Sequence, residues 1–226
     1  MSYIIKKVFA RSVIPLVKWY LTKDRSFRYK QLKIKVFSGV FHPGFYFSTK
    51  LLLDYLGNLY LTRKKVLELG AGTGIISLFA TRLGANVTAS DINPKAVANI
   101  CHNSQKYKAN IEVIQSDLFD SFVQQTFDYI VINPPYYPQN PKSDEEYAWY
   151  CGEDFGYFSK LFQQLPAFMK HNGQALMILS SDCALDQIRQ MAQKHHLQWQ
   201  EIKKVRVWWE HNYLIKITHH PSINTP

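Results

Sequence analysis

The sequence predicts an α/β fold with a mostly parallel, seven-stranded sheet and an antiparallel hairpin at its C-terminal end. From residue 65 onward, short apolar segments rich in β-formers alternate with segments of helical length, which is typical of a parallel sheet covered by helices on both faces. A glycine-rich turn joins the first of these strands to a helix. The last two strands are separated by residues 208–212 only, a connection too short for a parallel crossover, so they should be antiparallel.

The individual elements follow from this alternation. Strands are expected at residues 65–69, 86–90, 111–115, 127–132, 174–179, 198–207 and 213–218. Helices are expected at residues 74–83, 94–107, 156–170 and 184–195. Pro94 is suited to the first turn of its helix, because its fixed φ favours a helical start and the missing N–H has no partner there.

Size and cysteine content narrow the class of protein. A chain of 226 residues that is 46% hydrophobic can bury the core of one α/β domain and carry an extension. Cys101, Cys151 and Cys183 are scattered, without the paired spacing of a zinc site or of a disulfide framework. We therefore expect no metal site, and a reducing compartment, the cytoplasm.

The positive charge of the chain is concentrated at its start. The formal net charge is +10, and residues 1–35 contain ten lysines and arginines against Asp24 alone. We therefore divide the chain into a basic N-terminal extension, residues 1–35, and a nearly neutral domain, residues 36–226. Lysines and arginines interrupt every apolar stretch near the start, which argues against a transmembrane segment and favours a basic amphipathic helix. Such an extension suits RNA or an anionic membrane.

The first motif that carries chemistry is the glycine-rich turn in residues 66–74, Val-Leu-Glu-Leu-Gly-Ala-Gly-Thr-Gly. Glycines let a ligand approach the backbone, and the following helix offers free amide donors at its N-terminus. A nicotinamide-binding enzyme prefers the spacing Gly-x-Gly-x-x-Gly, whereas this turn has Gly-x-Gly-x-Gly preceded by the acid Glu68. A turn that only serves packing is the alternative.

Two further acids stand at predicted strand ends on the same edge of the sheet. Asp91 follows the second strand, about twenty residues after the glycine turn, where a carboxylate can accept hydrogen bonds from both ribose hydroxyls. Asp117 follows the third strand and could bind the amino group of adenine, with Ile92 or Leu118 packing on the ring. The alternative for Asp91 is a helix cap, and for Asp117 an ordinary exposed loop acid.

The motif Asn133-Pro134-Pro135-Tyr136 after the fourth strand indicates the reaction. A planar nitrogen is a poor nucleophile because its lone pair is delocalised, and two acceptors aimed at its N–H bonds favour the reactive pyramidal form. Asn133 supplies a side-chain carbonyl and Pro134 a rigidly held backbone carbonyl. Tyr136 offers a face on which a planar group can stack. A turn without function is the alternative. No Pro-Cys nucleophile and no ordered set of metal ligands compete with this interpretation.

With these motifs the chain resembles class I S-adenosylmethionine-dependent methyltransferases of the small-domain group, especially the short HemK-type enzymes. The resemblance covers about residues 36–219 and implies a Rossmann-like methyltransferase fold with S-adenosylmethionine as cofactor. It includes residues 40–53, similar to the family segment over the methionine end of the cofactor, and the stretch 148–156 after the catalytic motif. It implies that the catalytic residues are Asn133, Pro134 and Tyr136. It implies that the cofactor contacts Ser48, Thr49, Glu68, Gly70, Ala71, Gly72, Gly74, Asp91, Ile92, Asp117, Leu118 and Asn133.

The sequence also departs from HemK-type enzymes. HemK-type enzymes have an acid before threonine in this segment, whereas this chain has Phe47-Ser48-Thr49. A serine at this position resembles the sequence of ribosomal RNA guanine methyltransferases. The helical domain of long HemK proteins is replaced by the basic extension. The leading hypothesis is methyl transfer to a protein glutamine amide, and the second is transfer to an amino group of guanine or adenine in RNA or DNA. A non-catalytic Rossmann-like module tethered to RNA or to a membrane is the alternative of another class.

Overall fold

The computed structural model describes residues 22–44, 47–207 and 210–220, and the expected N-terminal amphipathic helix lies mostly outside these ranges. The central sheet contains seven strands in the order β5-β4-β3-β6-β7-β9-β8. In that order the strands are Ile111–Gln115, Asn86–Asp91, Lys65–Leu69, Phe127–Ile132, Met169–Ser180, Glu210–His219 and Leu197–Val207. Strands β3 to β7 are parallel, and β9 is antiparallel to both β7 and β8. The predicted fold class and the C-terminal hairpin are confirmed.

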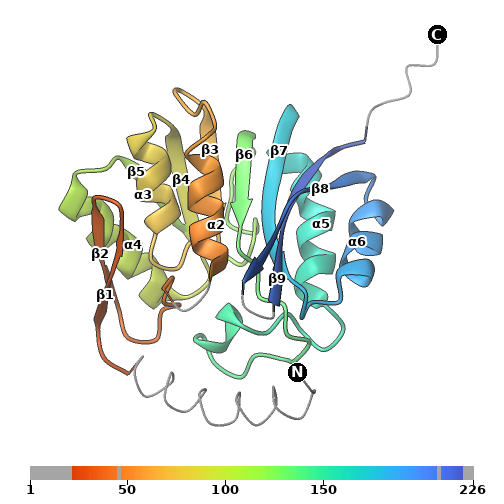
Figure 1. The fold of residues 1–226 in the computed structure, drawn as a ribbon, viewed down its shortest axis with the longest axis horizontal. Coiled ribbons are helices and arrows are strands. Elements are labelled where there is room, and N and C mark those ends of the chain that lie inside the picture. Colours follow the sequence, from red (N-terminus) through yellow and green to blue (C-terminus); the bar gives the residue numbers. More distant parts are fainter. Residues whose placement is uncertain (1–21, 45–46, 208–209, 221–226) are drawn as a thin grey trace.

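Helices cover both faces of the sheet (Figure 1). Helices α2 (Phe47–Leu56), α3 (Ile75–Arg82) and α4 (Pro94–Tyr107) lie on one face, and α5 (Gly156–Phe168) and α6 (Leu185–Lys194) on the other. Alternate residues of β3 enter the two cores, since Val66 packs with α2 and α3, whereas Leu67 and Leu69 pack with α5. A short 3₁₀ turn, η1 (Glu146–Ala148), lies in the long connection between β6 and α5.

The strand register brings the predicted motifs to one edge of the sheet. Leu69 at the end of β3 is in register with Ser90 of β4 on one side and with Ile132 of β6 on the other. Asp91 is in register with Gln115, the last residue of β5. The residues that follow these strands therefore emerge side by side at the carboxyl edge, which is where open α/β sheets bind ligands.

A two-stranded antiparallel hairpin, β1 (Arg25–Tyr29) and β2 (Leu32–Val36), precedes the central sheet. From the sequence, most of these residues are expected in the basic extension. In the structure Leu32, Ile34 and Val36 are buried in the same core as α2 and α3. The part of the extension from Arg25 onward therefore packs on the domain, while the boundary at residue 35 stays a prediction.

The helices α2 and α5 differ from the sequence-based expectation. No helix is predicted from the sequence for the segment that forms α2. The predicted helix 156–170 ends at Phe168, because Met169 and Lys170 begin the longer strand β7.

Among the described residues, no helix combines the length and apolar character needed to cross a bilayer. The same residues contain no group of three or more His, Cys, Asp or Glu side chains that could hold a metal ion.

Candidate active site

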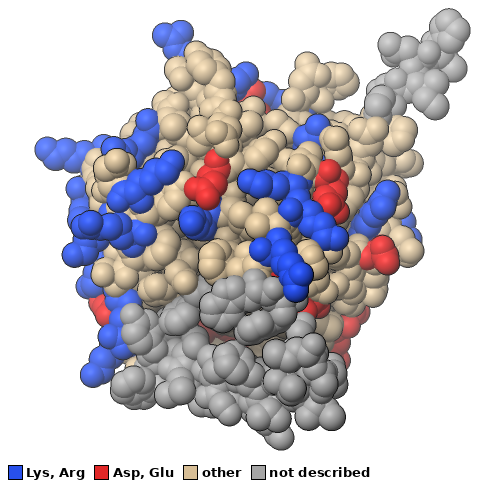
Figure 2. All heavy atoms as spheres, in the orientation of Figure 1, with Lys and Arg blue, Asp and Glu red and all other residues tan. Residues whose placement is uncertain are grey.

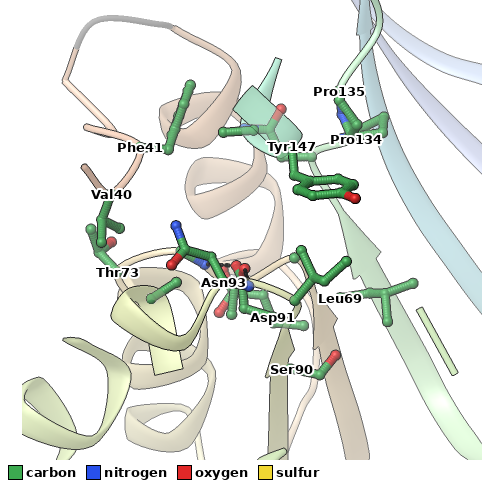
Figure 3. A pocket seen from close by; sticks show the side chains of 18 of the residues that line it. Val40, Phe41, Leu69, Thr73, Ser90, Asp91, Asn93, Pro134, Pro135 and Tyr147 are labelled. Carbon is green, nitrogen blue, oxygen red and sulfur yellow. Dashed lines mark hydrogen bonds between the residues drawn. The ribbon is translucent and has the colours of Figure 1, made fainter. Parts of the chain in front are cut away.

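A cavity opens at the carboxyl edge of β3, β4 and β6 (Figure 3). It is lined by residues from all four predicted motifs, from the loop between β2 and α2, and from the segment that contains η1. Of the residues predicted to act in binding or catalysis, those that line it are Ser48, Thr49, Glu68, Gly70, Ala71, Gly72, Asp91, Ile92, Asp117, Leu118, Asn133, Pro134 and Tyr136.

Gly74 is the predicted cofactor residue that the structure does not place on the cavity wall. It has φ 73° and directly precedes α3, and a Cβ there would lie 3.1 Å from the side chain of Ile100 on α4. Glycine at this position therefore lets two helices approach each other. By contrast, a Cβ on Gly70 would meet no atom within 4 Å, so that glycine faces the open cavity.

Glu68 is a buried acidic residue next to the glycine turn. Its side chain accepts hydrogen bonds from the backbone N–H of Ser77, at 2.7 Å, and from the Ser77 hydroxyl. Burial raises the pKa of Glu68 to about 8, and the two donors of Ser77 oppose that shift only in part. Burial therefore favours the protonated form of this carboxyl group.

The Asp91 side chain accepts hydrogen bonds from the backbone of the glycine turn and of the turn that precedes α4. Its Oδ2 accepts the N–H of Gly72 at 2.8 Å, and its Oδ1 accepts the N–H of Asn93 at 2.9 Å. Burial raises the pKa of Asp91, and these backbone donors lower it. The helix cap proposed as the alternative role belongs to Asn93, whose side chain accepts the N–H of Lys95. Asp91 is thus placed at the cavity, where it also fixes the glycine turn.

Asp117 lies at the outer end of the cavity and takes part in an ion pair. Lys160 of α5 lies 2.6 Å from Asp117 Oδ2 and also 2.6 Å from Asp120 Oδ2. The side chain of Asp117 is half exposed. Beside it, Leu118 is buried and contributes an apolar surface to the same cavity.

The Asn133–Tyr136 motif lines the cavity at the end of β6. The chain after this motif folds back on itself. Tyr137 N–H donates to the carbonyl of Trp149 at 3.1 Å, and Cys151 N–H donates to the carbonyl of Tyr137 at 3.0 Å. The stretch 148–156 therefore returns to the motif. Directly before it lies Tyr147, which is 42% exposed and lines the same cavity as Pro134 (Figure 3).

Two segments roof the cavity. One is the loop of Val40 and Phe41, both within 4.0 Å of the position that a Cβ on Gly72 would occupy. The other is the segment around η1, and the rings of Phe41 and Trp149 pack together with centroids 5.4 Å apart. Tyr147, and Tyr157 of α5, also line the cavity, although no sequence motif predicts them as site residues. The run of aromatic residues after the catalytic motif was the available signal for Tyr147.

The cavity fits a ligand with a polar, hydroxyl-bearing portion and an apolar ring. The hydroxyl of Ser90, fully buried on the wall, has no hydrogen-bond partner among the described residues. The carboxyl groups of Glu68 and Asp91 lie near the glycine turn, and Ile92 and Leu118 supply apolar surface. S-adenosylmethionine has this combination of hydroxyls, positive charge and an adenine ring.

Comparisons with known proteins agree with the geometry. The methyltransferase small domain profile matches residues 31–204. A putative protein N5-glutamine methyltransferase of Methanocaldococcus jannaschii is 34% identical over 157 residues, which cover 66% of this chain and 77% of that protein. A release factor glutamine methyltransferase of Lactococcus lactis is 43% identical over 74 residues, 32% of this chain and 27% of that protein. A tRNA1(Val) adenine-N6 methyltransferase of a Flavobacteriaceae bacterium is 29% identical and matches 55% of this chain and 54% of its own length.

Solved structures show the same fold. The E. cuniculi Mtq2–Trm112 complex, responsible for methylation of the termination factor eRF1, contains a chain that superposes with a TM-score of 0.62 at 22% identity, covering 80% of this chain and 99% of that one. A T. thermophilus 16S ribosomal RNA guanine-N2 methyltransferase, solved with S-adenosylmethionine and guanosine, gives 0.62 at 17% identity, covering 88% and 51%. With the profile match over most of the sequence, these findings confirm the expected family and cofactor. The chain therefore belongs to the methyltransferase small domain family and is an S-adenosylmethionine-dependent N-methyltransferase.

Proposed function

We propose that the protein methylates the side-chain amide of glutamine in a protein, with Asn133, Pro134 and Tyr136 as the catalytic residues. The observation that carries the proposal is the position of Asn133 and Pro134 on the cavity wall, at the end of the strand β6 that neighbours β3 and its glycine turn. The relative with the most extensive match described above is a putative glutamine methyltransferase, which supports the same acceptor.

The residues of the motif have distinct tasks. S-adenosylmethionine, when bound, supplies a methyl group whose bond to sulfur breaks as the bond to nitrogen forms. The Asn133 side-chain carbonyl and the Pro134 backbone carbonyl accept the two N–H hydrogen bonds of the acceptor amide, which localises its lone pair toward the methyl group. Tyr136 supports the planar acceptor from one side. The nitrogen then releases one proton to solvent.

The other predicted residues would hold the cofactor. Asp91 would bind the ribose hydroxyls, and the glycine turn would offer backbone amides to the methionine portion. Leu118 and Ile92 would pack on the adenine ring. The ion pair of Asp117 uses Oδ2, so Oδ1 could accept from the adenine amino group. Ser48 and Thr49, at the start of α2, line the same cavity and would contact the methionine portion.

A second candidate acceptor is an amino group of a nucleobase in RNA. It is favoured by a cluster of cations, Arg28, Lys33 and Lys106, which form no ion pair within the part of the chain that the structure describes. Arg28 lies directly opposite Lys33 in the β1–β2 hairpin, and Lys106 Nζ donates to the carbonyl of Lys33 at 2.6 Å. Like charges in a cross-strand pair repel, and an anionic partner such as a phosphate backbone relieves that repulsion.

A labelling experiment separates the two acceptors. The enzyme is incubated with S-adenosylmethionine that carries a labelled methyl group and with cell extract, followed by ribonuclease or protease. Label that survives ribonuclease and is recovered as N5-methylglutamine after complete enzymatic digestion of the protein identifies a glutamine amide. Label recovered as a methylated nucleoside after enzymatic digestion of RNA would overturn the glutamine proposal and support the second candidate.

We also propose a cytoplasmic location. All three cysteines, Cys101, Cys151 and Cys183, are free thiols in the structure. Free thiols are expected in a reducing compartment.

A further inference from the structure

The edge of β2 that faces away from β1 is bound by side chains of a helix. The backbone N–H and C=O of Lys33 both bond to the Tyr107 hydroxyl, at 2.6 and 2.9 Å. The N–H and C=O of Lys35 bond to the Asn103 amide, at 2.9 and 2.8 Å. Asn99 accepts the N–H of Phe37 at 2.8 Å and donates to the carbonyl of Lys35 at 2.9 Å.

The spacing of helix and strand explains this ladder. Asn99, Asn103 and Tyr107 are four residues apart on α4, which advances them by about 6 Å along one face of the helix. Alternate residues of a strand advance by about 6.7 Å and point their backbone groups toward the same edge. Side chains of α4 thus replace the backbone of a third strand along the edge of the hairpin.

Asn103 also reaches the cofactor site. Its Nδ2 donates to the carbonyl of Thr73 in the glycine turn at 3.0 Å, in addition to the carbonyl of Lys35. Asn103 and Asn99 are both fully buried, so neither amide can exchange a lost protein partner for bulk water. One buried amide group therefore joins the glycine turn to the strand that leads into the roof of the cavity.

We propose that Asn103, assisted by Asn99, is a positioning residue that fixes the roof loop of Val40 and Phe41 at the correct height above the glycine turn. Asn99 holds Phe37, three residues before Val40, and the N–H of Val40 bonds back to the carbonyl of Phe37 at 3.1 Å. The hairpin is accordingly a part of the cofactor site, connected to it through α4. The inference rests on the assignment of this cavity to S-adenosylmethionine.

The test compares two rungs of the ladder. Asn103→Leu removes the link to Thr73, and Tyr107→Phe removes hydrogen bonds of the same strand edge at Lys33, away from the cavity. We expect Asn103→Leu to weaken S-adenosylmethionine binding by about tenfold in calorimetry, equivalent to about 1.4 kcal/mol. Tyr107→Phe should lower the melting temperature while the dissociation constant stays within twofold of the parent protein. Equal dissociation constants for the two variants and the parent protein would overturn the proposal.

A second measurement keeps the test valid if Asn103→Leu does not fold. In the unmodified protein, hydrogen exchange of the Lys35, Phe37 and Val40 amides should slow at least severalfold when S-adenosylhomocysteine is added, together with that of the glycine turn. Protection confined to the glycine turn would refute the coupling. If the unmodified protein binds neither compound, the assignment of the cavity fails instead, so the two outcomes are distinguishable.

Discussion

Asn133 is the residue on which the proposed reaction depends most directly. Replacement of Asn133 by Ala removes an acceptor that acts on the nitrogen being methylated, so methyl transfer should fall by at least a hundredfold. Cofactor affinity should stay within a few-fold of the parent value, because the glycine turn and Asp91 are unchanged. Single-turnover transfer and calorimetry on the same preparation check this. Near-normal turnover in the variant would rule out the mechanism.

Asp91 should contribute mainly to cofactor affinity. Its carboxylate can offer charge-assisted hydrogen bonds to the ribose hydroxyls, and it also organises the glycine turn through the N–H of Gly72. Asp91→Ala should therefore weaken S-adenosylmethionine binding by on the order of ten- to a hundredfold. Calorimetry gives the dissociation constant, and circular dichroism checks the fold. An unchanged dissociation constant would leave Asp91 with a role in the turn alone.

Glu68 should make the stability of the ligand-free protein depend on pH. Its pKa is about 8 in the folded protein against an ordinary value of 4.5, so the folded state binds one more proton between these values. The free energy of unfolding should therefore decrease as pH rises from about 4.5 to 8 and become level above that range.

Glu68→Gln removes this titration while keeping an oxygen that can accept from Ser77. Relative to the parent protein, the variant should gain roughly 2–4 kcal/mol of stability between pH 4 and pH 9. Urea unfolding of both proteins at several pH values measures the difference. If the two stabilities change in parallel with pH, Glu68 is ionised in the folded protein and the assigned direction of its pKa shift is wrong.

At the scale of secondary-structure elements, the β1–β2 hairpin contributes to the hydrophobic core. Ile34 is only 1% exposed and packs with α2 and α3. Ile34→Ala should therefore lower the free energy of unfolding by about 2–4 kcal/mol, the usual cost of a large core truncation. Denaturant unfolding measures this, with Gln31→Ala at the exposed turn of the hairpin as the control. A loss below 0.5 kcal/mol would show that the hairpin is a dispensable arm.

The strands and helices between residues 65 and 132 were predictable because their information is local. Each strand there is a short apolar segment bounded by turn residues, and the Pro94–Tyr107 helix was predicted with its observed limits. The hairpin was missed because its many cations resembled a solvated extension, although Leu32, Ile34 and Val36 alternate with them. Its outer edge is satisfied by α4 residues more than sixty positions later, a pairing that no local pattern reveals.

The difference between local and long-range information also explains which residues of the candidate active site could be predicted. Glu68, Asp91 and Asn133 could be predicted because each occupies or follows the end of a parallel strand, and parallel strands end at one edge of a sheet. The ion pair between Asp117 and Lys160 depends on how α5 packs across 43 positions of sequence, so the residue alone did not indicate it. Tyr147 reaches the cavity only because its segment folds back along Tyr137.

At the scale of the whole molecule, positive charge predominates on the face drawn in Figure 2. Lysine and arginine side chains lie over the side that carries the β1–β2 hairpin and also over the middle of the view, where β8 and β9 lie, with few acidic side chains between them. Acidic residues are more frequent in the second half of the sequence, on the loops around α5 and before η1; they include Asp117, Asp120, Asp144, Glu145, Glu153 and Asp154. The hairpin thus adds a group of cations to the nearly neutral residues 36–226, and such a group can orient an anionic partner.

The cations of the hairpin lead to a prediction about RNA, the second candidate acceptor. If RNA binds there, each phosphate neutralised by Arg28, Lys33 or Lys106 contributes about −0.7 to the slope of log affinity against log salt for a single strand. The triple change of these residues to Gln should therefore reduce the magnitude of the slope by about 2 and lower affinity at low salt.

A control variant changes two cations of α6, Arg189 and Lys194, on the other flank of the sheet in Figure 1, and should leave the slope unchanged. Fluorescence anisotropy with a labelled oligonucleotide across a salt series measures both variants. Equal slopes for the triple variant and the control would exclude this cluster as a phosphate-binding surface. Binding to anionic vesicles that disappears in the triple variant, while RNA affinity is unaltered, would assign the cluster to a membrane surface instead.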